Sequence, residues 1–251
     1  MDFFVDQVNQ LISTIVARRR EVPAQRAVLV GISGIDASGK GFLTAKTVAR
    51  LQMQGVNAAA IGVDGWLNLP HVRFNRDNPA AHFYEHALRL DEMFDRLVLP
   101  LRDRRSISLE MDYAEETATE YRRHRYELQD LDVAVVEGIF LFKRRYWRQF
   151  DLSCWLDCSF ETALDRAIQR GQEGLPPAET ARAFETIYFP AQRIHFDRDS
   201  PRDSADLIIG NDERLAQRAP PLLIERESRI GKGVAHDTGH TIFGKCNVVR
   251  L

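Results

Sequence analysis

Residues 27–44 constrain the fold more than any other stretch of this sequence. Ala27 to Ile32 is a short apolar run with several β-branched residues, which predicts a buried β-strand. The next segment, Gly34–Lys40 with the sequence GIDASGK, matches the GxxxxGK part of a phosphate-binding loop. Phe42 to Gln54 then has helical periodicity, so the glycines are expected on a turn from a strand into a helix. A phosphate-binding loop requires this structural context.

Glycines in such a turn let backbone N–H groups point at a phosphate, and the N-terminus of the helix adds a favourable dipole. Lys40 supplies a mobile cation for the outer phosphates. The next position holds Gly41, where the motif has a Ser or Thr whose hydroxyl binds Mg²⁺, and Thr44 follows one turn later. The pattern therefore predicts a phosphate site and leaves the metal site open. The predicted nucleotide-binding residues are Gly34, Ile35, Asp36, Ala37, Ser38, Gly39, Lys40, Gly41 and Phe42.

Acidic residues follow two more predicted strands. Asn57–Val63 is expected to be a strand that ends at Asp64, and Leu131–Val136 a strand that ends at Glu137. Ligands of open α/β sheets bind outside the carboxyl ends of the strands. Asp64 is placed to accept the proton of a hydroxyl or to hold a Mg²⁺ water, and the alternative is a turn-forming Asp before Gly. Glu137 ends an apolar strand and needs a partner or a metal, which favours a role in binding Mg²⁺.

Composition and charge exclude several classes of protein. The formal net charge of −2 is made of both signs spread along the chain, which indicates no nucleic-acid partner. The three cysteines form neither a disulfide framework nor a metal-binding set. No apolar run is long enough to span a bilayer, so no membrane partner is expected. The N-terminus lacks the pattern of a signal peptide, and we therefore expect a cytoplasmic location.

We predict three parts in the chain. Residues 1–22 are expected to form an amphipathic helix packed on the core, residues 23–212 an α/β domain, and residues 213–251 a C-terminal extension. In the extension, His236 and His240 have the spacing of a metal-binding pair. Nearby glycines argue against a helix that would align them, and no third ligand is visible.

Two segments of the central domain invite both a functional and a structural interpretation. Arg166 and Arg170 lie next to a glycine-bounded segment, which is typical of a lid that closes over phosphates, and surface ion pairs are the alternative. We assign residues 166–190 to this lid region. The run Glu120–Arg125 places an aromatic residue among arginines, which suits either stacking on a substrate or a solvated charged surface. Before both segments in the chain, a helix over residues 80–99 is expected to end at Pro100.

The alternation of strands and helices predicts an α/β fold with a mostly parallel sheet flanked by helices. The predicted P-loop fold also has a lid and an N-terminal helix. By the order and spacing of its motifs, the chain resembles the uridine kinase, phosphoribulokinase and bacterial pantothenate kinase group of P-loop kinases, and the N-terminal helix lies outside this resemblance. The resemblance covers about residues 27–211. It is carried by GIDASGK at residues 34–40, VDGW at 63–66, VVEGI at 135–139, the arginines Arg166 and Arg170, and ADLII at 205–209.

This resemblance implies an ATP-dependent kinase that transfers the γ-phosphoryl group to a hydroxyl of a small molecule, with ATP and Mg²⁺ as cofactors. The loop and Lys40 would bind ATP, Asp64 would act as the base, and Asp64 and Glu137 would support Mg²⁺. Arg166 and Arg170 would neutralise the charge on the transferred group. The excursion at residues 65–130 would bind the acceptor. The contacts implied for the acceptor are Asp64, Trp66, Asp112, Tyr113, Arg122 and Arg123.

The acceptor itself stays open at this point. A nucleoside is the first expectation, and pantothenate or a sugar-like alcohol follows; a homo-oligomer also stays open. Gly41 motivates a second hypothesis, a degenerate P-loop protein that binds a nucleotide or phosphorylated metabolite as a regulatory module with little or no turnover. A nucleotide-hydrolysing switch is the third hypothesis. It would need a positioned water in place of the acceptor pocket that residues 65–130 are expected to build.

Overall fold

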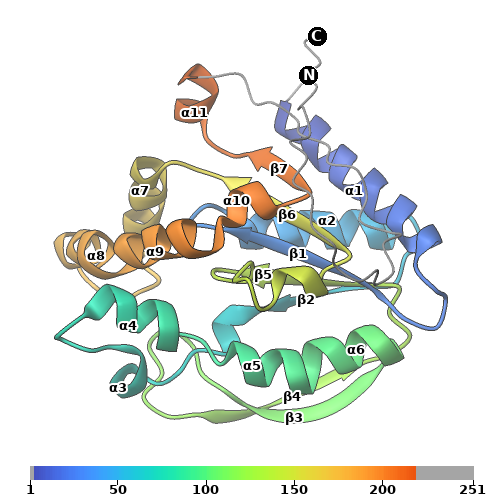
Figure 1. Ribbon diagram of the computed structural model, residues 1–251, viewed down its shortest axis with the longest axis horizontal. Helices are drawn as coiled ribbons and strands as arrows, with labels where there is room; N and C mark the ends of the chain where they lie inside the picture. The colour runs from blue at the N-terminus through green and yellow to red at the C-terminus, as the bar shows by residue number, and fades with distance from the viewer. Residues whose placement is uncertain (1–2, 219–251) are drawn as a thin grey trace, which may run out of the picture.

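The computed structural model describes residues 3–218, and its centre is a five-stranded sheet with the strand order β2-β5-β1-β6-β7 (Figure 1). All neighbouring strands in this sheet run parallel. This confirms the predicted α/β class with a parallel sheet flanked by helices. The strands are β1 (Val28–Gly34), β2 (Ala58–Gly62), β5 (Val133–Gly138), β6 (Leu152–Asp157) and β7 (Leu207–Gly210).

Helices cover both faces of the sheet (Figure 1). The α-helices are α1 (Phe3–Glu21), α2 (Lys40–Met53), α3 (Pro70–Arg73), α4 (Pro79–His86), α5 (Leu90–Met93), α6 (Leu99–Arg104), α7 (Phe160–Arg170), α8 (Pro177–Ala183), α9 (Phe189–Asp199), α10 (Pro201–Ser204) and α11 (Glu213–Arg218). The shorter turns are two 3-10 segments, η1 (Val63–Gly65) and η3 (Trp147–Gln149), and two π segments, η2 (Phe94–Val98) and η4 (Phe184–Tyr188).

The residues of β1 alternate between two hydrophobic clusters. Val28 and Val30 pack with apolar residues of α1 and α2, whereas Leu29 belongs to the larger cluster built by α4 to α9. Because successive side chains of a strand point to opposite faces, this alternation identifies the two layers of helices. The strand is buried at all seven positions, which matches its uninterrupted apolar sequence. This buried strand ends at the phosphate-binding loop and so fixes the position of the loop in the fold.

A two-stranded antiparallel ribbon lies outside the central sheet, at the lower edge of Figure 1. It is formed by β3 (Ile107–Tyr113) and β4 (Arg122–Leu128), and it lies inside the predicted excursion at residues 65–130. The sequence predicts a short strand over residues 106–111, close to β3. It does not predict β4, because four of its seven residues are arginine or histidine and its apolar alternation is weak.

The prediction that Pro100 ends a helix over residues 80–99 is wrong. The helix breaks earlier, after His86, and resumes at Leu90 to continue through Pro100 to Arg104. Just before the proline, the N–H of Leu99 bonds to the carbonyl of Phe94 in the wide π turn η2. Proline has no N–H and clashes with the preceding turn, and a π turn offers a local change of register that accommodates it. The segment η4 precedes Pro190 in the same way and joins α8 to α9.

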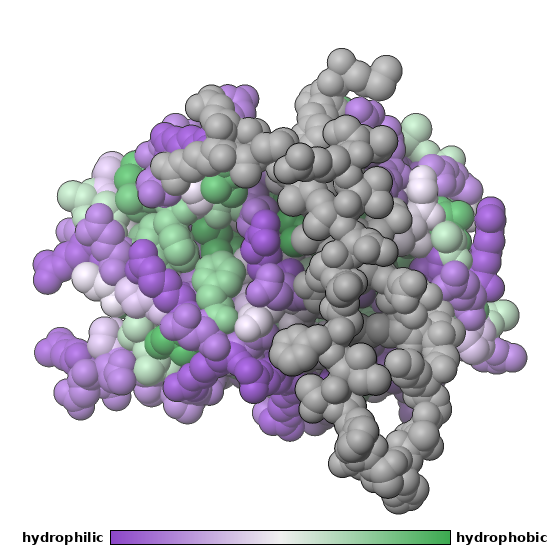
Figure 2. Space-filling model, turned by 45° about the horizontal axis from the view of Figure 1, so that its top comes forward, coloured by the Kyte–Doolittle hydropathy of each residue, from purple (hydrophilic) through white to green (hydrophobic). Residues whose placement is uncertain are grey.

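The coloured part of the face seen in Figure 2 carries both hydrophilic and apolar residues side by side. Among the described residues, the large apolar side chains that are exposed are Phe42, Met53, Val72 and Leu175. The ring of Phe42 stacks on Phe4, with ring centres 6.4 Å apart. Within residues 3–218, no helix has the length and apolar character needed to cross a membrane.

Candidate functional site

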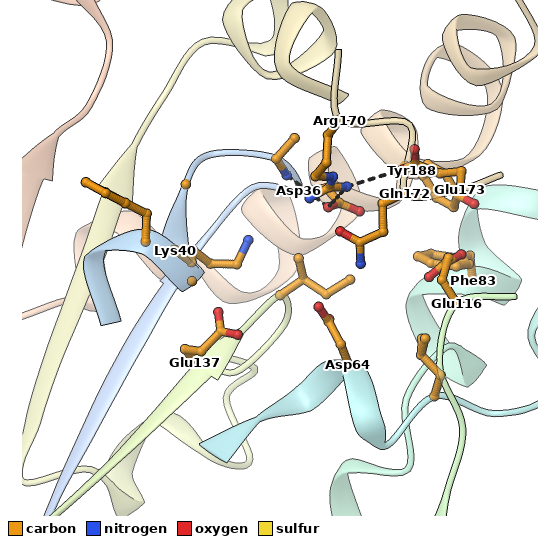
Figure 3. Close-up of a pocket in the computed structure, with 16 residues that line it drawn as sticks. Asp36, Lys40, Asp64, Phe83, Glu116, Glu137, Arg170, Gln172, Glu173 and Tyr188 are labelled. Carbon is orange, nitrogen blue, oxygen red and sulfur yellow. Dashed lines mark hydrogen bonds and ion pairs between the residues drawn. The ribbon is translucent and has the colours of Figure 1, made fainter. Parts of the chain in front are cut away.

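A cavity of about 310 Å³ opens at the carboxyl ends of β1, β2 and β5, where the phosphate-binding loop begins (Figure 3). In open α/β sheets this end of the strands is the usual place for a ligand. The cavity is lined by Asp36, Ala37, Gly39, Lys40, Gly41, Phe42, Asp64, Leu67, Phe83, Glu116, Glu137, Ile139, Arg170, Gln172, Glu173 and Tyr188. The structure therefore brings together the lysine of the phosphate-binding loop, Lys40, and the two strand-end acids that sequence analysis singled out, Asp64 and Glu137.

The phosphate-binding loop turns sharply from β1 into α2. Gly39 is the N-cap of α2 and has a φ of +97°, a conformation that favours glycine. A Cβ atom at this position would also lie only 2.6 Å from Nδ2 of Asn211. Lys40 Nζ donates to the carbonyl of Ile35 at 2.8 Å, so the lysine folds back over the loop. Six of the nine predicted nucleotide-binding residues line the cavity, and Gly34, Ile35 and Ser38 lie behind them.

Arg166 and Asn211 hold this loop from outside the cavity. The carbonyl oxygen of Ser38 accepts hydrogen bonds from Arg166 Nη1 at 3.0 Å and from Asn211 Nδ2 at 2.8 Å. Arg166 Nη2 also donates to the carbonyl of Asn211 at 2.8 Å. The structure thus places Arg166 on the backbone of the loop and does not bring it into the cavity. The Ser38 hydroxyl is buried and has no hydrogen-bond partner among the described residues.

The second predicted lid arginine does line the cavity. Arg170 is the last residue of α7, and its Nη2 atom lies 2.9 Å from Oε1 of Glu173 and 3.9 Å from Oδ1 of Asp36. Figure 3 shows Arg170 and Asp36 facing each other across the upper side of the cavity. Of the two predicted arginines, only Arg170 lines the cavity.

Asp64 lies in η1, directly after β2. Gly138 fixes the approach of this turn to the end of β5, because a Cβ atom there would overlap the side chain of Val63 at 2.1 Å. The carboxylate of Asp64 opens into the cavity between Lys40 and Glu116 (Figure 3). Its pKa is raised, first because the surrounding protein displaces bulk water and then because Asp36 is nearby, while Lys40 and Arg170 act in the opposite direction. A raised pKa brings a carboxylate closer to the value that suits a general base near neutral pH.

Glu137 lies near the end of the buried strand β5, on the same side of the cavity as Lys40 (Figure 3). Desolvation raises the pKa of Glu137 to about 7; the positive charge of Lys40 opposes this rise, and Asp64 and Asp36 add to it. A desolvated carboxylate gains most when a cation arrives beside it. Glu137 therefore has the surroundings expected of a group that binds a metal ion together with a phosphate.

The site fits a nucleotide with Mg²⁺ better than it fits a metal ion alone. Among residues 3–218, no group of three or more His, Cys, Asp and Glu side chains is arranged to hold a metal ion. Mg²⁺ commonly keeps several waters and binds through one or two carboxylates and the phosphates of its substrate. A Cβ atom at Gly41 would have no neighbour within 4 Å, so the space for a hydroxyl is present although the hydroxyl is not. Thr44 is buried and does not line the cavity, so it offers no replacement in this conformation.

The predicted acceptor residue Trp66 is a core residue in this structure. It is 1% exposed, its ring stacks on Tyr126 with ring centres 6.0 Å apart, and its Nε1 donates to the Tyr126 hydroxyl at 3.1 Å. Tyr113 packs directly over Gly65, since a Cβ atom at Gly65 would lie 2.1 Å from the Tyr113 ring. Trp66 and Tyr113 thus support the turn that carries Asp64, and neither lines the cavity.

The remaining predicted acceptor residues lie on the ribbon. Arg123 pairs with Glu110 and with Asp112, each at 2.8 Å, and Arg122 pairs with Glu115 at 2.5 Å. All of these side chains are exposed, and none of them lines the cavity. The structure does not bring Asp112, Arg122 and Arg123 to the site. Their arrangement matches the solvated charged surface that was the alternative for this segment.

Several residues at the site were not found from the sequence. They are Phe83, Glu116, Gln172, Glu173 and Tyr188, which line the cavity, and Asn211, which holds the loop. Asn211 follows β7, so the same strand-end argument that found Asp64 applies to it. The others come from helices and loops whose sequence carries no motif, and only the fold brings them to one place.

No known family model matches this chain. Solved structures do match it over most of its length. One is a possible uridine kinase from Bacillus stearothermophilus, with a TM-score of 0.64, 20% sequence identity, and coverage of 81% of this chain and 97% of that chain. A candidate fructose transport system kinase from Silicibacter sp. TM1040 has a TM-score of 0.64, 20% identity, and coverage of 80% and 98%. D-glycerate 3-kinase from Cryptococcus neoformans var. grubii has a TM-score of 0.57, 15% identity, and coverage of 81% and 95%.

These similarities define the class of fold. The chain has the fold of the P-loop kinases, with a parallel sheet, a phosphate-binding loop after the first strand and an additional N-terminal helix. The neighbours include a uridine kinase-like protein, which agrees with the resemblance seen in the sequence motifs. At these levels of identity the comparison concerns the fold, and the chemistry has to be argued from the site.

Proposed function

We propose that this protein is an ATP-dependent kinase that transfers the γ-phosphoryl group to a hydroxyl of a small molecule. The observation that carries the proposal is the meeting of three groups at one cavity: Lys40 from the start of α2, Asp64 directly after β2 and Glu137 from the end of β5. Phosphoryl transfer depends on positioning and on electrostatic stabilisation, and these three groups supply the charges that it needs. The structural neighbours described as kinases agree with the proposal.

Each group has a defined task in this proposal. The loop backbone and Lys40 bind the outer phosphates of ATP. Asp64 accepts the proton of the acceptor hydroxyl, and its raised pKa suits a base at neutral pH. Mg²⁺, when bound, would neutralise charge on the phosphates, and Glu137 with Asp64 would hold it directly or through water. Arg170 lines the same cavity and adds positive charge beside the phosphates.

The second candidate is a nucleotide-binding regulatory module with little turnover, and Gly41 favours it. The hydroxyl that would bind Mg²⁺ at this position is missing, and Thr44 does not reach the cavity. Binding of nucleotide without an acceptor-dependent reaction would identify this candidate.

The test is release of ADP from ATP and Mg²⁺ across a panel of nucleosides, sugars, pantothenate and simple alcohols. Release that depends on one of these acceptors would establish the kinase. Asp64→Asn should then lower kcat by about 10²- to 10⁴-fold, since it removes the base, while nucleotide affinity changes little. A fully active Asp64→Asn variant would remove Asp64 from the mechanism. Tight ATP binding without release for any acceptor would support the regulatory module.

A further inference from the structure

The end of the cavity away from the phosphate-binding loop contains two carboxylates that the proposed reaction does not use. Figure 3 shows Glu116 and Glu173 on the side opposite Lys40 and Glu137, next to the rings of Phe83 and Tyr188. These two rings contact each other, with ring centres 4.9 Å apart. Asp64, the proposed base, lies between the two ends. An acceptor whose hydroxyl reaches Asp64 would therefore extend towards Glu116 and Glu173.

Glu173 has an unused hydrogen-bond acceptor at this end. Its side chain is only 5% exposed, and its Oε1 atom pairs with Arg170 at 2.9 Å. The other oxygen, Oε2, is buried and has no hydrogen-bond partner among the described residues. A buried carboxylate oxygen without a partner loses much of its hydration, and no hydrogen bond offsets this free-energy cost. Since Glu173 lines the cavity, a ligand is able to supply the missing donor.

Glu116 is held in place from behind. Arg73 is 2% exposed, its Nη2 atom donates to the backbone carbonyl of Glu116, and the same atom lies 3.6 Å from the Glu116 carboxylate. Desolvation raises the pKa of Glu116 to about 7, with Arg73 opposing this effect. Arg73 itself does not line the cavity. At this end of the cavity a ligand therefore meets the carboxyl group of Glu116, and it does not meet the guanidinium group of Arg73.

The balance of charge around the cavity disfavours an acidic acceptor. Lys40 and Arg170 are the basic residues that line it, and Arg170 is already shared between Glu173 and Asp36. The phosphates of a bound nucleotide would occupy Lys40. The acidic residues that line the cavity are Asp36, Asp64, Glu116, Glu137 and Glu173. A carboxylate or phosphate on the acceptor would face these charges without a free cation among the described residues that line the cavity.

We propose that Glu116 and Glu173 recognise the acceptor and that this acceptor is an uncharged polyhydroxyl compound, a free sugar or the ribose of a nucleoside. Hydroxyl groups donate to carboxylates in short, charge-assisted hydrogen bonds. A site built around such bonds discriminates strongly against a ligand that leaves them unmade. The inference rests on the proposed kinase function and narrows it, because it excludes acceptors such as pantothenate that carry an acid group.

Matched pairs of acceptors, one uncharged and one acidic, test in the full-length protein whether the site prefers an uncharged acceptor. The pairs are glycerol with glycerate, D-ribose with D-ribose 5-phosphate, and pantothenyl alcohol with pantothenate, and uridine is added as a nucleoside. We expect kcat/KM for ADP release to be at least about tenfold higher for the uncharged member of any pair that reacts, because the acidic member brings an unpaired negative charge next to the carboxylates of the cavity. Equal or greater use of the acidic member would overturn the inference and leave the kinase proposal standing.

Calorimetric titration of the same compounds into the protein with Mg²⁺ and ADP gives a second measurement that needs no turnover. If no compound causes ADP release, the kinase proposal fails, and the titration still decides the inference. Tighter binding of the uncharged members would support it. Tighter binding of the acidic members, or no binding of any compound, would overturn it.

Two variants assign the recognition to the named residues. Glu173→Gln and Glu116→Gln should each raise KM for the best acceptor by about tenfold, the loss expected for one charge-assisted hydrogen bond, with KM for ATP nearly unchanged. The two variants should also lower the ratio of kcat/KM between the uncharged and the acidic member of each pair. A purely structural defect would leave this ratio unchanged. Glu179→Gln, on the exposed side of α8 and away from the cavity, is the matched control. Unchanged acceptor KM in both variants, with normal melting temperatures, would overturn the assignment.

Discussion

The nucleotide end and the acceptor end of the cavity are built in different ways. The proposed nucleotide end comes mainly from one continuous stretch, Gly34–Phe42, which supplies the backbone and Lys40, and Glu137 joins it from β5. The acceptor end is assembled from Leu67, Phe83, Glu116 and the segment 172–188, which are far apart in the sequence. A site made by a continuous backbone leaves a motif in the sequence, whereas a site made by scattered side chains leaves none.

The two ends also differ in how their charges are satisfied. At the nucleotide end, Lys40 bonds to the loop carbonyl of Ile35, and Glu137 remains desolvated beside it. At the acceptor end, Glu116 and Glu173 each have an arginine partner, Arg73 and Arg170. The proposed nucleotide end therefore suits a cation and phosphates. At the acceptor end both carboxylates have an arginine partner, and the buried atoms there without a hydrogen bond among the described residues include Oε2 of Glu173 and Nε and Nη1 of Arg73. The predictions below test this difference.

Lys40→Ala should have the largest effect, because it removes the mobile cation of the nucleotide end. Acceptor-dependent turnover is expected to fall by about 10²- to 10³-fold, the range seen when one stabilising donor is removed from an active site. Nucleotide affinity, measured by calorimetry, should fall as well. Lys46→Ala is the matched control, since Lys46 lies in the same helix over the ring of Phe42 and does not line the cavity. Equal activity of the two variants would contradict the proposed role of Lys40.

Glu137→Gln should stabilise the nucleotide-free protein in a pH-dependent way. The folded-state pKa of Glu137 is raised to about 7 from an ordinary value of 4.5, so between these values the folded protein binds more protons than the unfolded chain. The stability of the natural protein therefore falls as pH rises from about 4.5 to 7. The glutamine of the variant does not titrate, so this pH-dependent loss of stability is absent. It should be more stable at pH 8, by up to about 3 kcal/mol, and nearly equal to the natural protein at pH 4.5.

Chemical denaturation at the two pH values measures this effect. Glu127→Gln is the control, because Glu127 is exposed on β4 and pairs with Arg125 at the surface. Exposed ion pairs contribute little to stability, so this control should change little at either pH. A difference for Glu137→Gln that does not depend on pH would show that the burial of the carboxylate is not its cause.

Gly41→Ser should have a moderate effect, confined to the nucleotide end. The open space at this position admits the side chain, and its hydroxyl would add a Mg²⁺ ligand. We expect the Mg²⁺ concentration for half-maximal activity to fall by about tenfold, the worth of one added hydrogen bond or ligand. Gly41→Ala controls for the helix-stabilising effect of replacing glycine at the start of α2. Equal behaviour of the Ser and Ala variants would mean that the added hydroxyl does not reach the metal.

The central sheet and the phosphate-binding loop are predictable from the sequence for a physical reason. A strand buried on both faces, such as β1 or β5, requires an uninterrupted apolar run, and each run here leads into residues that line the cavity. Asp64 and Glu137 could be placed near Lys40 because parallel strands present their carboxyl ends at the same edge. The position of these residues therefore follows from the backbone geometry of a parallel sheet, without knowledge of side-chain packing.

The individual residues of the acceptor end could not be predicted, although they lie within the predicted excursion at residues 65–130 and the predicted lid region at residues 166–190. Their meeting depends on packing between distant segments. The π turn before Pro100 extends a helix where a proline normally ends one, and no local pattern signals it. Glu116 and Glu173 belong to segments that meet only in the fold, where Gly174 lies close to Thr117. Arg122 and Arg123 were predicted to bind the acceptor, since arginines beside aromatic residues often bind ligands. In the structure their charges are satisfied by acids of the neighbouring strand and its turn.

Replacing both ribbon arginines, Arg122→Ala with Arg123→Ala, should therefore have the smallest effect. Their side chains are 63% and 59% exposed and lie outside the cavity, so KM for the acceptor should change by less than about threefold, as for an exposed ion pair. Steady-state kinetics with the best acceptor measures this. A rise in acceptor KM as large as that expected for Glu173→Gln would contradict the division of the cavity described above. It would mean that the ribbon closes onto the acceptor during the reaction, and that the charged run at residues 120–125 contributes a third wall to the site.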